Sequence, residues 1–164
     1  MIGLGIGSQP IVGYNYGAKN YKRVKATYIR TITAGLIVGV IGWGCFQLFT
    51  QQIIDIFGQE SELYNQFALK CFHIFLGVVF LVGFITPSGI FFQSIGKPVK
   101  AMISTMTRQL IYFLPAAFIL AGAMGVEGLL YAGPVSDILA AITVVILIFR
   151  EMAIINRDIK LQDA

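Results

Sequence analysis

The chain has 164 residues, of which 57% are hydrophobic and only 12% are charged, and its mean hydropathy is +0.79. A soluble globular domain carries roughly 25% charged residues, so this composition predicts a membrane protein and excludes an ordinary soluble domain. The net charge of +4 does not indicate nucleic-acid binding, because no soluble basic face interleaves Lys or Arg with aromatic residues. We therefore expect the lipid bilayer, and no nucleic acid, among the partners of this chain.

The first helix is predicted over residues 1–18 and is rich in glycine. Two pairs of glycines recur four residues apart, a spacing that lets a neighbouring helix approach closely. Pro10 removes one backbone donor and predicts a bend. Three polar residues in this apolar segment are predicted to line a cavity: Gln9, Tyr14 and Asn15. The alternative is that they only bond to neighbouring helices, as polar residues in membrane bundles often do.

Four complete membrane spans are predicted after the first helix, because a span needs about 20 mainly apolar residues. Their expected limits are residues 31–54, 67–93, 101–124 and 129–149. The span over residues 67–93 is expected to bend at Pro87, and Gln93 at its end is expected to line the inner mouth of a cavity. Residues 51–65 are predicted to form an external loop with a short helix at the bilayer surface. Residues 150–164 are predicted to be a solvated tail.

The sequence as a whole predicts an all-α, polytopic membrane helix bundle with one partial and four complete transmembrane helices. Lys and Arg accumulate in short loops on the cytoplasmic side of a membrane. All basic residues except Lys70 fall in the first connection, in residues 97–108 or in the C-terminal tail, which lie on one side of the alternating spans. We predict a location in the cell membrane, with the C-terminus in the cytoplasm.

The sequence contains no recognisable catalytic constellation. Its single histidine, His73, has no carboxylate beside it at metal-ligand spacing. There is no phosphate-binding glycine loop in a soluble context and no nucleophile motif of the G-x-S-x-G type. We therefore predict a protein that is not an enzyme, with no catalytic residues, no metal site and no cofactor.

Two ionisable residues lie deep in the predicted spans, where a buried charge is costly and usually indicates function. Arg108 is eight residues beyond Lys100, which places it about 12 Å into the membrane at a rise of 1.5 Å per residue. Asp137 is predicted at a similar depth on the following helix. We hypothesise that Arg108 and Asp137 pair, or that each caps a polar cavity in the cytoplasmic half, and both are candidates for ion or proton coupling. A purely structural ion pair is the alternative.

Four motifs, in order, resemble the multidrug and toxic compound extrusion (MATE) family of secondary transporters. They are GSQPIVGYNYGAKNYKRVK at residues 7–25, FFQSIGKP at 91–98, RQLIYFLP at 108–115 and GLLYAGPVSD at 128–137. The resemblance implies that residues 1–164 begin inside the eighth helix of a twelve-helix transporter. They would form a partial C-terminal lobe, and the N-terminal lobe, its expected partner, is missing from this sequence.

The same resemblance implies secondary active efflux. An inward Na⁺ or H⁺ gradient would drive alternating access of two lobes and expel a small organic, often cationic, drug or toxic metabolite. The fragment alone is expected to be inactive. Some members carry an acidic residue implicated in cation coupling on the helix that corresponds to residues 67–93, and this chain has none there. Two alternatives remain: a lipid-linked precursor flippase of the same broad fold, and a small membrane subunit that does not transport.

Overall fold

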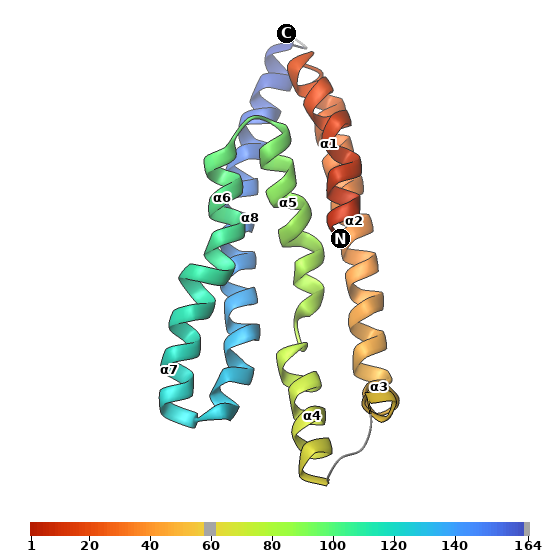
Figure 1. The fold of residues 1–164 in the computed structure, drawn as a ribbon. Coiled ribbons are helices and arrows are strands. Elements are labelled where there is room, and N and C mark those ends of the chain that lie inside the picture. The colour runs from red at the N-terminus through yellow and green to blue at the C-terminus, as the bar shows by residue number, and fades with distance from the viewer. Residues whose placement is uncertain (58–61, 163–164) are drawn as a thin grey trace.

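The computed structural model describes residues 1–57 and 62–162, which form an elongated bundle of helices (Figure 1). The helices are α1 (Ile2–Gly17), α2 (Tyr21–Leu48), α3 (Thr50–Phe57), α4 (Glu62–Phe75), α5 (Val82–Ser94), α6 (Pro98–Met106), α7 (Leu114–Met124) and α8 (Val126–Gln162). A 3₁₀ turn, η1 (Val79–Leu81), precedes α5, and a π-helix, η2 (Thr107–Phe113), joins α6 to α7. The described residues contain no strand, and the predicted all-α membrane bundle is confirmed.

Within the described residues, three helical stretches are long and apolar enough to cross a membrane: Tyr21–Leu48, Pro98–Met124 and Val126–Gln162. A fourth crossing results if Asn65–Phe75 and Val79–Ser94, which meet at a bend of 42°, are counted as one broken span. This number agrees with the four complete spans expected from the sequence. α1 has 16 residues, fewer than the about 20 that a full crossing needs.

The second helix begins earlier than the predicted residue 31. Asn20 caps α2, because its Oδ1 accepts a hydrogen bond from the backbone N–H of Arg23 at 3.3 Å. Such a side-chain acceptor satisfies one of the amides that a helix leaves unpaired at its start. Lys22, Arg23, Lys25 and Arg30, expected around a connecting loop, therefore lie in the first turns of α2, and Lys19 stays in the connection.

The span over residues 67–93 contains a break that the sequence did not predict. The α-helical pattern stops after Phe75 and resumes at Val82. Backbone hydrogen bonds of the tighter 3₁₀ type connect this break, among them those from Gly77 N to Ile74 O at 3.1 Å and from Leu81 N to Val78 O at 3.0 Å. Tightened turns of this kind relieve a helix that cannot continue regularly.

Pro87 and Pro10, where bends were predicted, lie inside α5 and α1, and bends at these two prolines stay predictions. Pro87 leaves the carbonyl of Gly83 without its usual helical donor. That carbonyl oxygen is directed at α2, since a Cβ on Gly35 would lie only 2.4 Å from it. The two glycines thus let the backbones of α2 and α5 approach closely beside the proline.

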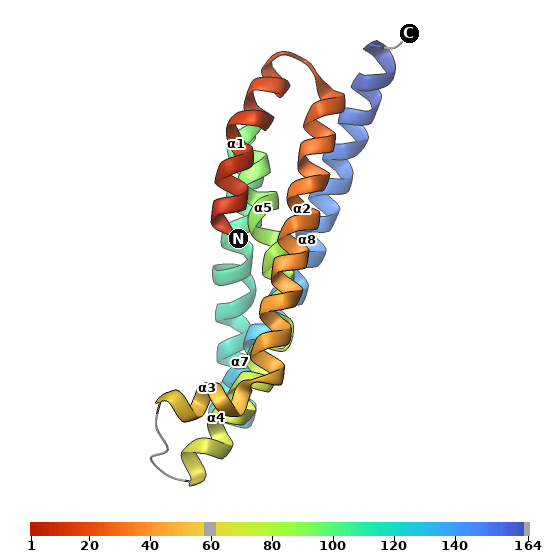
Figure 2. The same cartoon turned by 90° about the vertical axis from the view of Figure 1, so that its right-hand side faces the viewer.

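The short helix predicted between two spans is confirmed as α3. It lies crosswise to the bundle, because it is seen end-on in Figure 1 and from the side in Figure 2. Residues 58–61 of the predicted 51–65 loop lie outside the described residues. α4 begins at Glu62, so the loop is shorter than predicted.

The C-terminal segment differs from the predicted solvated tail, because residues 150–162 continue α8. An apolar stripe runs on past Phe149 through Ile155, which is 1% exposed, and packs this part of α8 on the bundle. Glu151 lies in the same stripe and is completely buried. Ile148, Glu151 and Ile155 are spaced so that they lie on one helix face. This spacing was the sequence signal that α8 continues past Phe149. Residues 163–164 lie outside the described residues.

Glu151 holds the turn between α5 and α6 against α8. Its carboxylate accepts hydrogen bonds from Lys97 Nζ at 2.5 Å and from Lys100 Nζ at 2.7 Å. The Glu151 side chain is 0% exposed, whereas the two lysine side chains keep 29% and 31% of their exposure. A carboxylate removed from water needs such partners, because its desolvation costs several kcal/mol.

Replacing Glu151 with glutamine is expected to lower the free energy of unfolding by about 3 kcal/mol, because two lysines lose the buried charge that they share. The midpoint of thermal unfolding, followed by circular dichroism in detergent, should fall by roughly 10 °C. Asp158→Asn is the matched control on the same helix. Asp158 is as far as 3.9 Å from its partner Arg157, which is largely exposed, and such exposed ion pairs contribute little to stability. Equal midpoints for the two variants would contradict the role given to Glu151.

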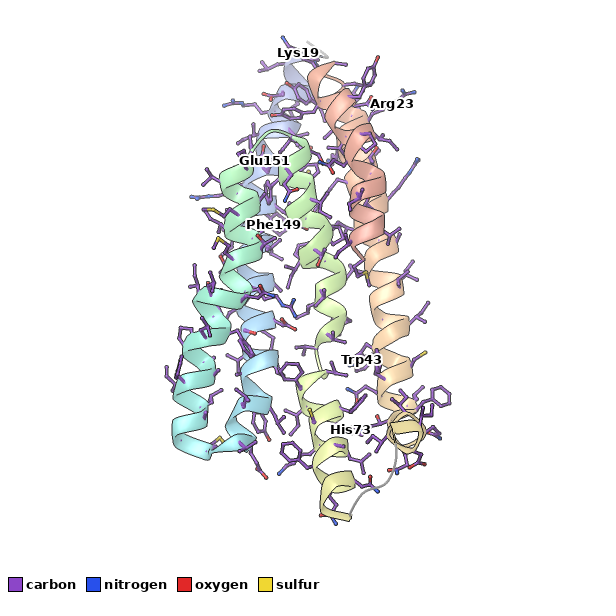
Figure 3. The ribbon with its side chains drawn as sticks, in the orientation of Figure 1. Lys19, Arg23, Trp43, His73, Phe149 and Glu151 are labelled. Atoms are coloured by element: carbon purple, nitrogen blue, oxygen red, sulfur yellow. The ribbon has the colours of Figure 1, made fainter. Side chains whose placement is uncertain are left out.

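Basic residues gather at one end of the bundle. The α1–α2 connection, the α5–α6 turn and the end of α8 lie together at the top of Figure 1, and Figure 3 places Lys19 and Arg23 there. α3 and the α7–α8 turn lie at the opposite end. There Lys70 Nζ pairs with Glu127 Oε1 at 2.7 Å, which links α4 to α8. The connections rich in Lys and Arg thus lie at one end of the bundle, as the sequence predicts.

Candidate functional site

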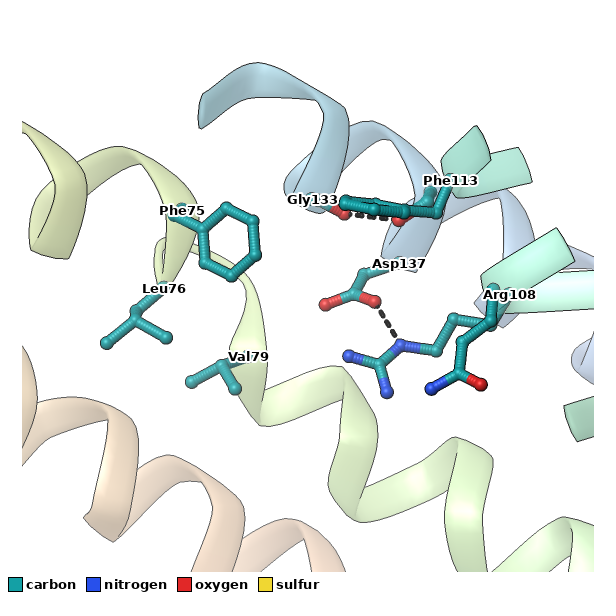
Figure 4. A pocket seen from close by; sticks show the side chains of 9 residues that line it. Phe75, Leu76, Val79, Arg108, Phe113, Gly133 and Asp137 are labelled. Carbon is teal, nitrogen blue, oxygen red and sulfur yellow. Dashed lines mark hydrogen bonds and ion pairs between the residues drawn. The ribbon is translucent and has the colours of Figure 1, made fainter. Parts of the chain in front are cut away.

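A cavity of about 280 Å³ lies between the break that precedes α5, the π-helix η2 and α8 (Figure 4). Its lining residues are Phe75, Leu76, Val79, Arg108, Gln109, Phe113, Gly133, Ser136 and Asp137. Most of these are apolar, and the charged side chains among them are one arginine and one aspartate. The two ionisable residues that the sequence places deep in the spans therefore share one cavity.

Arg108 and Asp137 form an ion pair, as hypothesised from the sequence. Arg108 Nε donates to Asp137 Oδ1 at 2.5 Å. The side chain of Asp137 is 6% exposed and that of Arg108 is 35% exposed. The second carboxylate oxygen, Oδ2, makes no hydrogen bond to a residue in the described part of the chain, and Figure 4 shows it on the side of the cavity away from Arg108. One face of the carboxylate is thus open to a ligand in the cavity.

Arg108 lies on the π-helix η2. The backbone widens to π-helical geometry over Thr107–Phe113, and Pro115 follows two residues later. In a regular α-helix the ring of Pro115 would clash with the carbonyl of Ile111 and leave it without a donor. A wider turn removes this conflict, and π-helical turns occur frequently at functional sites. The sequence did not predict the π-helix, although Pro115 was its signal.

On the opposite wall, the position one turn before Asp137 on α8 is a glycine, Gly133. Gly133 has no side chain, and a Cβ there would lie 2.7 Å from the ring of Phe75. Ser136 Oγ donates to the carbonyl oxygen of Gly133 at 2.7 Å, so its hydroxyl is satisfied within α8. The ring of Phe75 can therefore lie against α8 and close the side of the cavity nearest α4.

The cavity combines a buried carboxylate, already paired with an arginine, with aromatic and aliphatic walls. The rings of Phe75 and Phe113 are the aromatic part of this lining. No three His, Cys, Asp or Glu side chains converge anywhere in residues 1–57 and 62–162. Asp137 is thus the carboxylate that lines this cavity.

The polar residues predicted to line a cavity lie elsewhere. Asn15 is 8% exposed, and its Nδ2 donates to the carbonyl oxygen of Ile11 at 2.8 Å. Tyr14 is 79% exposed on the outer face of α1, Gln9 is half-buried and Gln93 is exposed near the end of α5. The structure does not bring these four residues to the Arg108–Asp137 cavity, and their role stays a prediction.

Several lining residues were not predicted as site residues. Leu76 and Val79 reach the cavity only because the helix breaks after Phe75, and the sequence placed that bend at Pro87. No pattern in the sequence marks these apolar positions as different from packing residues. Gln109 could have been found, because it follows Arg108 directly and lines the same cavity.

Comparison with known proteins shows the family of this chain. The family model MatE matches residues 1–119, which is more than half of the chain. The chain is 36% identical over 62 residues to the "Probable multidrug resistance protein YoeA" of Bacillus subtilis (strain 168), a match that covers 38% of this chain and 13% of that protein. It is 25% identical over 142 residues to "Protein DETOXIFICATION 56" of Arabidopsis thaliana, covering 87% of this chain and 28% of that protein.

Solved structures agree with this match. The fold is similar to a multidrug resistance MATE family transporter in an inward-facing conformation, with a TM-score of 0.84 and 17% identity over 93% of this chain. An outward-facing structure gives a TM-score of 0.84 and 19% identity, and at such identities the likeness shows the fold alone. The chain spans 36% and 35% of these two transporters, and still less of the two curated relatives. With the family model covering most of its length, this chain belongs to the MATE family of membrane transporters.

Proposed function

We propose that this chain is part of a secondary transporter that expels organic, often cationic, compounds in exchange for Na⁺ or H⁺. The observation that carries this proposal is the buried Arg108–Asp137 pair beside a cavity in a MATE-type fold. Its relatives support it, since two are described as multidrug resistance proteins. A transporter of this kind performs no covalent chemistry, so no enzymatic activity is proposed.

Asp137 is the proposed coupling residue. Arg108 donates a hydrogen bond to Oδ1. A proton or Na⁺ that reaches the other oxygen, Oδ2, would neutralise or balance the carboxylate charge. The attraction between the two side chains would then be weaker. Arg108 lies on η2 and Asp137 on α8, so a weaker pair frees these two helices to move relative to each other. A cation that binds one arrangement better than the other shifts the population between them.

The substrate path is proposed to run along α1, where Gln9, Tyr14 and Asn15 lie, with Gln93 at the end of α5. Tyr14 is 79% exposed, so this face of α1 is available to another part of a protein of the relatives' length. We propose that the N-terminal lobe covers it. The basic end of the bundle is proposed to face the cytoplasm in a cell membrane, in accordance with the rule for Lys and Arg in short loops.

The proposed function is tested by transport in membrane vesicles from cells that express the reading frame containing this segment. We expect a fluorescent organic cation such as ethidium to move when a Na⁺ or pH gradient is imposed, and to stop when an ionophore collapses that gradient. Ethidium movement that ignores the gradient would contradict antiport. A flippase of the same fold would instead translocate a lipid-linked precursor and leave ethidium where it is.

The length of the working protein is tested with an antibody against the C-terminal residues 155–164. We expect a band about three times the 18.0 kDa of this chain, since the chain spans about a third of the solved transporters. A native band near 18.0 kDa would contradict a single-chain transporter of that length. It would favour the alternative of a small membrane subunit that does not transport.

A further inference from the structure

A second cavity, separate from the Arg108–Asp137 site, lies between α2, α5 and α8. It has a volume of about 290 Å³, and none of its lining residues belongs to the first cavity. Tyr28, Ile32 and Thr33 form the wall on α2, and Val145 and Phe149 form the wall on α8. The cavity is an open groove, because Phe149 at its edge is 73% exposed.

The groove offers apolar contact and few free polar groups. The hydroxyl of Tyr28 is hydrogen-bonded to Ser88 Oγ at 2.9 Å. The hydroxyl of Thr33 donates to the carbonyl oxygen of Ile29, also at 2.9 Å. The other lining side chains carry no polar atom except the thioether sulfur of a methionine. Because a polar ligand would lose its hydrogen bonds to water here, the groove suits an alkyl chain.

One end of the groove carries a positive charge. Lys25 is one turn before Tyr28 and Ile29, on the same face of α2. Its Nζ donates to Asn156 Oδ1 on α8 at 2.8 Å. Asparagine is neutral, and no carboxylate pairs with Lys25 among the residues that the structure describes. The ammonium group thus keeps its charge at the end of an apolar groove.

The carboxylates nearest in sequence to the α8 wall form ion pairs with residues other than Lys25. Glu151 is completely buried and shared by two lysines. Asp158 lies 3.9 Å from the guanidinium of Arg157. The charge of Lys25 is therefore available to an anion from outside the protein.

The position along the helices matches the boundary between lipid headgroups and acyl chains. Arg30 is the last charged residue before the apolar part of α2, and Arg150 is the first after the apolar part of α8. Thr33 is eight residues beyond Lys25, or about 12 Å along the helix. A phosphate at Lys25 would therefore lie at headgroup level while the groove extends into the hydrocarbon region.

We propose that this groove binds an anionic phospholipid, with one acyl chain between α2 and α8 and the phosphate hydrogen-bonded to Lys25. The apolar walls supply contact for the chain, and the uncompensated ammonium selects a negative headgroup. This binding does not depend on the proposed transport function.

The proposal is tested by native mass spectrometry of the full protein that contains this segment, purified in detergent and titrated with phosphatidylglycerol or with phosphatidylcholine that carries the same acyl chains. We expect preferential retention of phosphatidylglycerol. Lys25→Gln should weaken that retention about fivefold. Arg23→Gln is the matched control, because it removes one charge from the opposite side of the same helix. Equal retention of both lipids, or equal effects of Lys25→Gln and Arg23→Gln, would overturn the proposal.

A second pair of variants tests the groove itself. Thr33→Phe fills it and should reduce retention of both lipids, whereas Val38→Phe, on another face of α2, should not. If Thr33→Phe retains phosphatidylglycerol as well as the unchanged chain does, the acyl chain is not in the groove.

A photo-crosslinker separates a lipid from a polypeptide as occupant. Phe149→p-benzoylphenylalanine, activated in the host membrane, should give an adduct with phospholipid. An adduct with protein and none with lipid would mean that a polypeptide covers the groove, and the proposal would be wrong.

Discussion

Replacing Gly35 with valine is expected to force α2 away from α5 and to destabilise the bundle strongly. A Cβ on Gly35 would lie 2.4 Å from the carbonyl oxygen of Gly83, and a Cβ on Gly83 would lie 2.4 Å from that of Gly35. Both obstacles are backbone atoms, so no side-chain rotation can relieve the clash. We expect a loss of about 3 kcal/mol, the upper end for overpacked cores, and a fall of roughly 10 °C in the unfolding midpoint.

The matched control is Gly42→Val on the same helix. A Cβ on Gly42 meets nothing within 4 Å, so this variant should unfold within a few degrees of the unchanged chain. Both variants add the same side chain to α2 and change its helix propensity equally. If Gly35→Val and Gly42→Val have the same midpoint in detergent, the close contact between α2 and α5 does not contribute to stability.

Replacing Asp137 with asparagine is expected to lower gradient-driven efflux by roughly 10- to 100-fold. The substitution keeps the shape of the side chain and removes the charge, so it removes the charged partner of Arg108 and the open carboxylate oxygen. Hydrogen bonds to charged groups contribute about 1.5–3 kcal/mol, which corresponds to that range of rates or affinities. The measurement is ethidium transport into vesicles under an imposed Na⁺ or pH gradient, normalised to the amount of transporter present.

Asp158→Asn is the control for this experiment, because it removes a carboxylate from the same helix near its C-terminal end, outside the cavity. We expect normal efflux from that variant. The result that would rule out Asp137 as the coupling residue is an Asp137→Asn variant that is present at normal levels, unfolds normally and transports at the rate of the unchanged protein.

Most of the architecture follows from patterns that the sequence shows directly. Long apolar runs predict the spans, and the distribution of Lys and Arg predicts which connections share an end of the bundle. Depth counted along two consecutive helices brought Arg108 and Asp137 to the same level. That estimate needed only the helical rise, and the ion pair is present in the structure.

Tertiary packing explains where the sequence was misleading. Pro87 is the strongest local signal for a bend in this span, because proline lacks a donor, yet α5 continues through it. The helix breaks after Phe75 instead, and that break creates one wall of the cavity. No local pattern near Gly77 is as strong as a proline, so this wall could not be predicted.

Glu151 shows a different limit of sequence reasoning. A charged residue that follows the last long apolar run normally belongs to a solvated segment. Here Lys97 and Lys100 come from the start of α6, more than fifty residues earlier in the chain, and together they make burial of the carboxylate possible. Such a long-range pairing cannot be read from composition, although the apolar spacing of Ile148 and Ile155 indicated that the helix face continues.

The hypothesis that Arg108 and Asp137 couple a cation gradient to efflux, and do not simply hold helices together, is best tested with both residues replaced. Arg108→Met combined with Asp137→Leu removes the pair without leaving a buried charge, and such replacements by apolar residues are often neutral or stabilising. We expect a folded protein with an unfolding midpoint close to that of the unchanged transporter and no gradient-driven ethidium transport. A folded double variant that still transports at the normal rate would contradict the coupling role and leave a purely structural ion pair.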